Sequence, residues 1–366
     1  MKIETFVNSM FRGSRLPAAT GVAALLGSLA SCHYGSNYAA STIFVPNSIA
    51  VADVNADGVP DLLVATTADQ GNPHNPGFAN VILGNKTSPG AFLTGVQYPT
   101  TGDDPSSIAV ADLTGTGGLD LVVSNFSAGS VSVFMHGATP GTYQSAVNVL
   151  TGGLPNAVVI GDLNGDGKPD ILVADNSTAG HAIILFQDPA NPGQFLAPVE
   201  LATGTSGAAA VAIADLNGDG ANDIVVATSD ANGNNGAVFV FYQNAAAHGT
   251  FLAPVSFPAG AQPDAIKVAD VNGDGLPDII VSNLGPGADS TGSAGVSVLL
   301  QDASHPGTFL SASSYAAFGE PLGVAIADLN KDGHPDIAVA DGASALVLLQ
   351  NATAPGTFAQ PVQVGN

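Results

Sequence analysis

Oxygen-bearing side chains recur at fixed spacing along this chain. Five segments follow the pattern Asp-x-Asn-x-Asp-Gly-x-x-Asp, and a sixth keeps only its two outer aspartates, Asp112 and Asp120. Ca²⁺ takes six to eight oxygen ligands in a flexible shell, and glycine permits the sharp turn that brings such ligands together. The pattern therefore predicts a calcium loop. The intact copies are Asp53, Asn55, Asp57, Asp61; Asp162, Asn164, Asp166, Asp170; Asp215, Asn217, Asp219, Asp223; Asp270, Asn272, Asp274, Asp278; and Asp328, Asn330, Asp332, Asp336.

We expect each intact loop to bind one ion, which gives about five Ca²⁺. The side chains at positions one, three, five and nine supply ligands, and the backbone carbonyl at position seven supplies another. The seventh residues are Val59, Lys168, Ala221, Leu276 and His334. The altered copy has threonines at positions three and five, so Asp112 and Asp120 are weaker candidates.

Two other interpretations of the loops are less consistent with the sequence. An EF-hand needs a bidentate Glu at position twelve and flanking helices. Position twelve is valine in every intact loop, within an apolar run typical of a strand. A hairpin of Asx turns without metal would hold three carboxylates close together, and each pair would repel by roughly 1–4 kcal/mol.

The charge of the chain disfavours nucleic acid as a partner. The formal net charge is −23, and only three of the 30 acidic residues are Glu. After residue 31 the only basic residues besides histidine are Lys86, Lys168, Lys267 and Lys331. A surface that follows phosphates needs many more cations than this.

The N-terminus has the pattern of an export signal. Lys2, Arg12 and Arg15 precede an apolar stretch from residue 16 to 30, which is short for a membrane span. The ending Leu-Ala-Ser-Cys32 resembles a bacterial lipobox. We therefore expect a lipoprotein signal peptide at 1–31, a lipidated tether at 32–40 and a lipid on Cys32. The chain would be exported and anchored to a bacterial membrane, at the outer membrane or cell surface. An ordinary signal peptide is the alternative.

The loops lie within a larger repeat of 50 to 59 residues. Alternating residues such as 48–52 precede each loop and predict a first strand with large residues on one face and mostly Ala on the other. A continuous apolar run such as 171–174 follows each loop and predicts a second, covered strand. A third apolar run, a Pro-Gly-x-Phe turn or a variant, and a weaker fourth strand complete the unit. Small residues on the first strand suit a place near a central axis.

Four antiparallel strands per repeat predict an all-β fold, a β-propeller of six four-stranded blades over residues 41–366. The calcium loops would join the first and second strands. Residues 38–45 align with the fourth-strand region, so a strand from one end of the chain could close the ring. A linear solenoid is the alternative, but it would need polar caps that the sequence does not show.

The repeats resemble the FG-GAP/VCBS type found in integrin α-subunit propellers and in secreted bacterial proteins. The resemblance covers about residues 41–366. The Phe-Gly…Gly-Ala-Pro motif of the family is matched only in part, at Phe195-Leu-Ala-Pro198 and Phe251-Leu-Ala-Pro254. The resemblance implies a calcium-stiffened propeller used for adhesion or recognition. Blade two departs from the pattern because it lacks the Asn and the middle Asp.

No catalytic constellation is visible in the sequence, so we expect a binding or adhesion module for a protein or glycan partner. Variable connections on the face opposite the loops are the expected recognition surface. Lys267 replaces Ala or Val on the inner strand and is expected either to face the channel or to offset nearby Asp charge. A calcium-dependent carbohydrate-active enzyme and a scaffold subunit of an outer-membrane complex remain as alternatives. Polar candidates on that surface are Asn72, His74, Asn125, Asp230, Asn234, Asn235, Asn283 and Asp289.

Overall fold

The computed structural model describes residues 43–69, 76–178, 180–230, 233, 235–285, 294–317, 319–342 and 344–364. These residues form 24 strands and one 3₁₀ turn, η1 (Phe126–Ala128). The strands make six separate antiparallel sheets of four strands each, in chain order, as predicted. The predicted signal peptide, the tether and Cys32 lie outside the described residues. So do Asn72, His74, Asn234 and Asp289.

Each sheet is one blade. Blade one comprises β1 (Ile43–Ala52), β2 (Asp61–Asp69), β3 (Pro76–Ile82) and β4 (Val96–Asp103). Blade two comprises β5 (Pro105–Ala111), β6 (Asp120–Asn125), β7 (Ser130–Phe134) and β8 (Val147–Leu150). Blade three comprises β9 (Pro155–Gly161), β10 (Asp170–Asp175), β11 (His181–Leu185) and β12 (Val199–Ala202).

The second half of the chain repeats this arrangement. Blade four comprises β13 (Ser206–Ala214), β14 (Asp223–Ser229), β15 (Gly236–Phe241) and β16 (Val255–Ala259). Blade five comprises β17 (Pro263–Ala269), β18 (Asp278–Asn283), β19 (Gly295–Leu299) and β20 (Ser313–Ala316). Blade six comprises β21 (Pro321–Ala327), β22 (Asp336–Asp341), β23 (Ser344–Leu348) and β24 (Val362–Val364).

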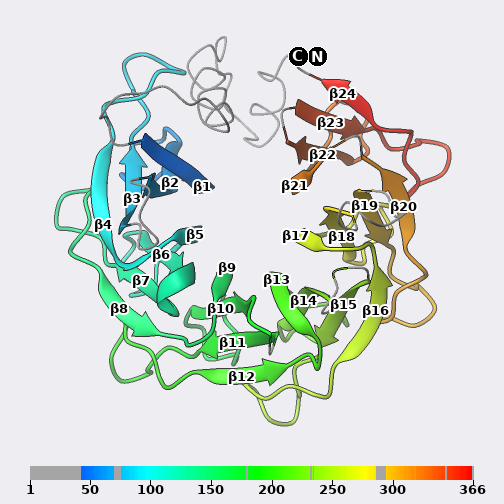
Figure 1. The fold of residues 1–366 in the computed structure, drawn as a ribbon, viewed down its shortest axis with the longest axis horizontal. Helices are drawn as coiled ribbons and strands as arrows, with labels where there is room; N and C mark the ends of the chain where they lie inside the picture. The colour runs from blue at the N-terminus through cyan, green and yellow to red at the C-terminus, as the bar shows by residue number, and fades with distance from the viewer. Residues whose placement is uncertain are drawn as a thin grey trace.

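The blades are arranged around a central axis (Figure 1). The first strand of each blade is innermost and the fourth is outermost, so the Ala-rich strands line the channel as the sequence predicts. The second strands are covered on both sides, and every residue of β6, β10 and β18 is buried. Continuous apolar runs without alternation fit this position.

The hydrophobic core lies between blades. One cluster joins each consecutive pair, so that Leu63 of blade one packs with Ile108 and Phe134 of blade two. Corresponding clusters join blades two and three, three and four, four and five, and five and six. Each blade is thus stabilised by its neighbours, as expected for stacked repeats that cannot bury both faces alone.

The expected ring-closing strand is not present among the described residues. Residues 43–46, which include part of the segment aligned with fourth strands, instead extend β1 and pair with residues 66–69 of β2. β24 pairs only with β23 of its own blade. Residues 38–42 of that segment lie outside the described residues, so the prediction of a ring-closing strand stays untested there. No helix in the described part of the chain is long and apolar enough to cross a membrane.

Candidate metal centres

The six predicted loops all join the first strand of a blade to its second strand. Their backbone winds tightly because positions four and six have positive φ in every copy. In the third loop Gly165 and Gly167 have φ of 72° and 80°. Ala56 and Lys331 adopt the same conformation at position four, at 57° and 65°. A side chain there is strained, whereas position six is always Gly, as the turn requires.

Backbone amides fold the polar side chains into this winding. In the third loop both carboxylate oxygens of Asp162 accept hydrogen bonds, from the amides of Gly165 at 2.7 Å and Gly167 at 2.9 Å. Asn164 Oδ1 accepts from the Asp166 amide at 2.9 Å. Asp166 Oδ1 accepts from Lys168 at 2.9 Å. Two of these bonds recur in the other four intact loops. The amide of the sixth residue donates to the first Asp, and the amide of the seventh residue donates to the Asp at position five.

The ninth aspartate holds each loop to the blade. All six copies have no exposed surface. One oxygen accepts from the second residue of its own loop at 2.9 or 3.0 Å. The other accepts from the residue that follows the third strand, at 2.7 or 2.8 Å. That residue is Gln in four blades, a recurrence in the sequence that marks this contact and that the Asp spacing alone does not reveal.

Burial makes four of these carboxylates hard to ionise without a counter-ion. Desolvation raises the pKa of Asp170, Asp223 and Asp278 to about 6, against backbone hydrogen bonds that lower it. The nearby aspartates of the same loop raise the pKa further. The pKa of Asp61 is raised by the same effects. A divalent cation in the loop would favour the ionised form.

The loop residues fit calcium in chemistry. Three carboxylates, one amide oxygen and the backbone carbonyls form an all-oxygen donor set, which suits a hard cation. Among the described residues, no lysine forms an ion pair with a loop carboxylate. No group of three or more His, Cys, Asp or Glu side chains in that part of the chain is already arranged as a metal cluster. In three loops the side-chain amide of the Asn at position three donates a hydrogen bond to the Asp at position five, as Asn217 does to Asp219 at 3.0 Å.

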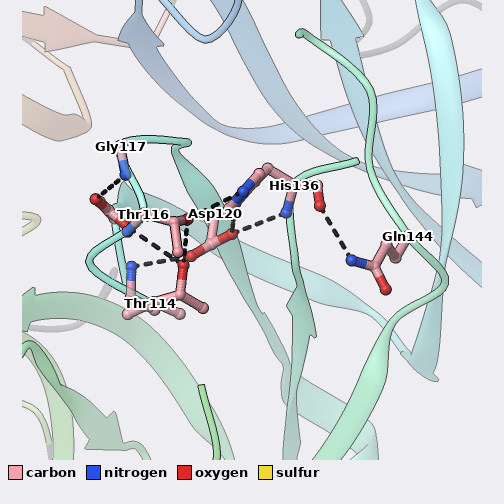
Figure 2. Close-up of polar contacts among 8 residues, drawn as sticks. Thr114, Thr116, Gly117, Asp120, His136 and Gln144 are labelled. Carbon is pink, nitrogen blue, oxygen red and sulfur yellow. Dashed lines mark hydrogen bonds and ion pairs between the residues drawn. The ribbon is translucent and has the colours of Figure 1, made fainter. Parts of the chain in front are cut away.

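Blade two differs because a histidine occupies its loop (Figure 2). His136 Nδ1 lies 2.7 Å from Asp120 Oδ1, and its Nε2 lies 3.2 Å from the Thr116 hydroxyl. The hydroxyl oxygens of Thr114 and Thr116 are 2.8 Å apart. His136 stands where the other blades have Gln or, in blade one, Gly84. The imidazole of His136 and the threonine hydroxyls therefore supply hydrogen-bond partners to the polar side chains of this loop. The sequence showed the lost ligands but not the histidine, which comes from a distant strand end.

The face opposite the loops carries a second polar region. A cavity of about 1130 Å³ is lined by residues of blades three to five, including Asn156, Thr205, Asp230 and Asp264. Burial raises the pKa of Asp264 to about 6. Two predicted surface residues do not belong to this region. Asn125 and Asn283 are buried and donate to Ser132 and Ser297, because the second strand extends to them.

Lys267 lines the central cavity and is exposed there, which confirms that it faces the channel. Asp104, Asp264 and Lys267 are the charged residues of that lining. The rest of the lining is mostly small and apolar, in keeping with the Ala-rich inner strands.

Three solved structures with a similar fold carry the names of enzymes but are distant in sequence. A provisionally named 6-phosphogluconolactonase from Bacteroides uniformis is 16% identical, with a TM-score of 0.57 over 89% of this chain and 88% of that one. Its counterpart from Bacteroides fragilis is 17% identical, with the same score over 87% and 84%. Hydrazine synthase from Kuenenia stuttgartiensis is 14% identical, with a TM-score of 0.53 over 86% and 80%. These likenesses show the fold alone.

Comparison with protein families gives a more specific result. No curated protein matches the chain. The model of the FG-GAP-like repeat matches residues 53–123, 116–173, 162–226 and 215–281, which together exceed half of the chain. Each match begins or ends at one of the aspartate loops described above. The chain therefore belongs to the FG-GAP-like repeat family, and its fold is a β-propeller of six blades.

Proposed function

We propose that this protein is a calcium-binding propeller that is exported, held at a bacterial membrane through Cys32, and used to bind a protein or glycan partner. An FG-GAP propeller supports a binding or adhesion role in general. The calcium, the anchor and the partner are the proposal. The observation that carries it is the common fold of the five intact loops, in which backbone amides hold oxygen-bearing side chains and a buried carboxylate within one short turn.

The ions have a structural role in this proposal. Each loop fixes the junction of the first and second strands, and its ninth aspartate also binds the end of the third strand. A cation that neutralises the loop would hold three strand ends in one arrangement. Ion binding to the folded chain alone stabilises it by about 2.7 kcal/mol per site when the free ion is 100 times the Kd.

The partner would bind on the face that carries the cavity beside Asp264. Its lining contains hydroxyls, amides and two carboxylates, with no Lys, Arg or His. This surface would favour neutral or positively charged groups that donate hydrogen bonds. The overall charge of −23 would favour the same partners.

A glycan array and a panel of surface proteins, probed with the purified chain in calcium and in EDTA, test the proposal. We expect binding that weakens in EDTA and that Asp264→Ala reduces at least several-fold. Glu200→Gln, on an exposed outer strand, is the matched control and should bind as the parent does. Release of reducing ends from a polysaccharide would contradict the binding role and favour an enzyme.

A further inference from the structure

The junction between blades six and one differs from the five junctions between consecutive blades. In Figure 1 the six blades follow an arc, and the first and sixth blades stand apart at the top of the view. A cavity of about 1500 Å³ reaches both of them and continues along the channel to Lys267. We call the facing surfaces of these two blades the sixth seam. Five internal seams of known composition are available for comparison.

Each internal seam has two halves that can be matched residue by residue. The following blade contributes its leading face, centred on the large inner-strand residue four positions before the first loop aspartate. At the five internal seams this residue is 4–7% exposed. The equivalent residue of blade one is Ile49, which is 41% exposed, and Val51 beside it is 38% exposed. The five buried equivalents of Ile49 are Ile108, Val158, Val211, Ile266 and Val324.

Blade six carries the complementary half without a partner. Leu329, Ala338 and Val347 form a cluster with Ala327, Leu349 and Val364, all from blade six. By strand register these six match the half that blade one gives to the first seam. Ala340 is exposed, whereas its equivalents in blades one and two, Ala65 and Ser124, are fully buried. The two faces of the sixth seam are thus the two halves of an ordinary seam.

The residues of the sixth seam also provide less cohesion. Ala338 stands where the other blades have Leu63, Val122, Leu172, Val225 and Ile280. Val364 stands where Tyr98, Phe257 and Tyr315 make edge contacts with an aromatic ring of the next blade. Smaller side chains bury less apolar area, so contact between these faces is intrinsically weaker than elsewhere.

Among the described residues, the polar links that join some neighbouring blades have no counterpart at the sixth seam. The bulged residue of the inner strand donates to a carbonyl of the next blade at Asn47, Ser106 and Asn156, over 2.6–2.9 Å. In blade six this residue is Leu322, which, like Ala209 in blade four, cannot donate. Gln243 and Gln350 reach back to a carbonyl of the preceding blade. Blade one has Gly84 at this position.

We propose that the sixth seam is a clasp, which closes when the leading face of blade one packs on blade six and opens the channel sideways when they part. Each of the two faces is the binding partner of the other, because their residues are matched halves of a seam. Both faces belong to one chain, which raises their effective concentration. The structure describes the open state. A long ligand could then enter the channel without threading through an end. This proposal stands independently of calcium and of the proposed partner.

Thiol labelling tests the open state. Cys32 is the only cysteine, so Cys32→Ser gives a background without thiols. In it, Ile49→Cys should react with a maleimide at least about tenfold faster than the matched Ile108→Cys, because only the first is exposed without local opening. Leu322→Asn, which restores a donor, should slow the labelling of Ile49→Cys several-fold, and Leu322→Ala should not. Equal rates at residues 49 and 108 would overturn the proposal.

Cross-linking tests the closed state. Ile49→Cys with Ala340→Cys spans the sixth seam, and Ile266→Cys with Ala227→Cys is the matched pair within one internal core. Under mild oxidation we expect both pairs to form a disulfide within one chain, the first pair more slowly. If the internal pair oxidises while the seam pair stays reduced, the faces do not meet and the proposal is wrong. Disulfides between two chains would also overturn it and assign the seam to a second copy.

Discussion

At the scale of single residues, the ninth aspartate of each loop connects metal chemistry to folding. Its two oxygens accept backbone hydrogen bonds from its own loop and from the end of the third strand, as Asp223 does from Leu216 and Gln243. The same carboxylate is a predicted ligand. Removing its charge should therefore affect both stability and ion binding, and the altered loop of blade two provides a way to separate the two effects.

Replacing this aspartate by asparagine gives the first prediction. Asp223→Asn places an amide N–H against a buried backbone donor, which should lower the free energy of unfolding by about 1–3 kcal/mol. It should also remove one bound calcium. Asp120→Asn is the matched control, with a similar loss of stability and an unchanged calcium count. Urea unfolding and ion analysis measure both, and an unchanged count for Asp223→Asn would contradict its role as a ligand.

The raised pKa values predict how metal-free protein responds to pH. Asp170, Asp223 and Asp278 have a folded pKa of about 6 against an ordinary value of 3.8. The folded chain therefore holds more protons than the unfolded chain between these values. In EDTA, stability should be greatest near pH 4 and fall as the pH rises through 6. Saturating calcium should abolish or reverse this trend, because the ion needs ionised carboxylates.

Urea midpoints at pH 4.5, 5.5 and 6.5 provide the measurement. Aspartates with a lowered pKa, such as Asp302 and Asp332, stabilise the fold when ionised and lose this stabilisation only below pH 3.8. They therefore do not mask the pH dependence of the buried carboxylates. Stability in EDTA that increased steadily across this interval would contradict the account of the buried carboxylates.

At the scale of elements, the sequence predicted most of the blade and missed what depends on distant contacts. The alternation before each loop, the apolar run after it and the third apolar run specify three of the four strands locally, and the Asp spacing specifies the loop. Asn125 and Asn283 were assigned to surface loops, yet they lie buried at strand ends, because serines of the third strand satisfy their amides. His136 was missed because its role depends on the packing of β7 against the loop.

The blade-two loop gives a prediction of gained function. The triple variant Thr114→Asn, Thr116→Asp and His136→Gln restores the ligands of the other blades and removes the side chain that fills the loop. We expect one additional calcium per chain, measured by titration calorimetry. His136→Gln alone is the control and should add none. A triple variant that folds but binds no further ion would show that these positions are insufficient.

The inter-blade cores give a prediction about packing. Leu172 of β10 is fully buried between blades three and four, so Leu172→Ala should cost about 2–5 kcal/mol of unfolding free energy. Leu196 is 48% exposed, and Leu196→Ala should change stability by less than about 0.5 kcal/mol. Similar losses for the two variants, measured by urea unfolding, would contradict a core located between blades.

At the scale of the whole molecule, the ring of blades follows from the sequence repeat. The weaker junction between blades six and one follows from residues that differ from the repeat. The count of six loops predicted six blades. Gly84 was visible in the sequence as an exception at its position, and Leu322, like Ala209, as a residue without a side-chain donor. Their meaning required the structure, which shows that both positions form links across the seams.

The number of calcium ions that one folded chain binds, measured together with its melting temperature, tests the central claim most directly. Purified protein dialysed against calcium and analysed for metal should hold about five ions. Chelation should then lower the melting temperature by many degrees, because each saturated site contributes on the order of 2–3 kcal/mol. A chain that retains no calcium and melts at one temperature with or without EDTA would contradict the account.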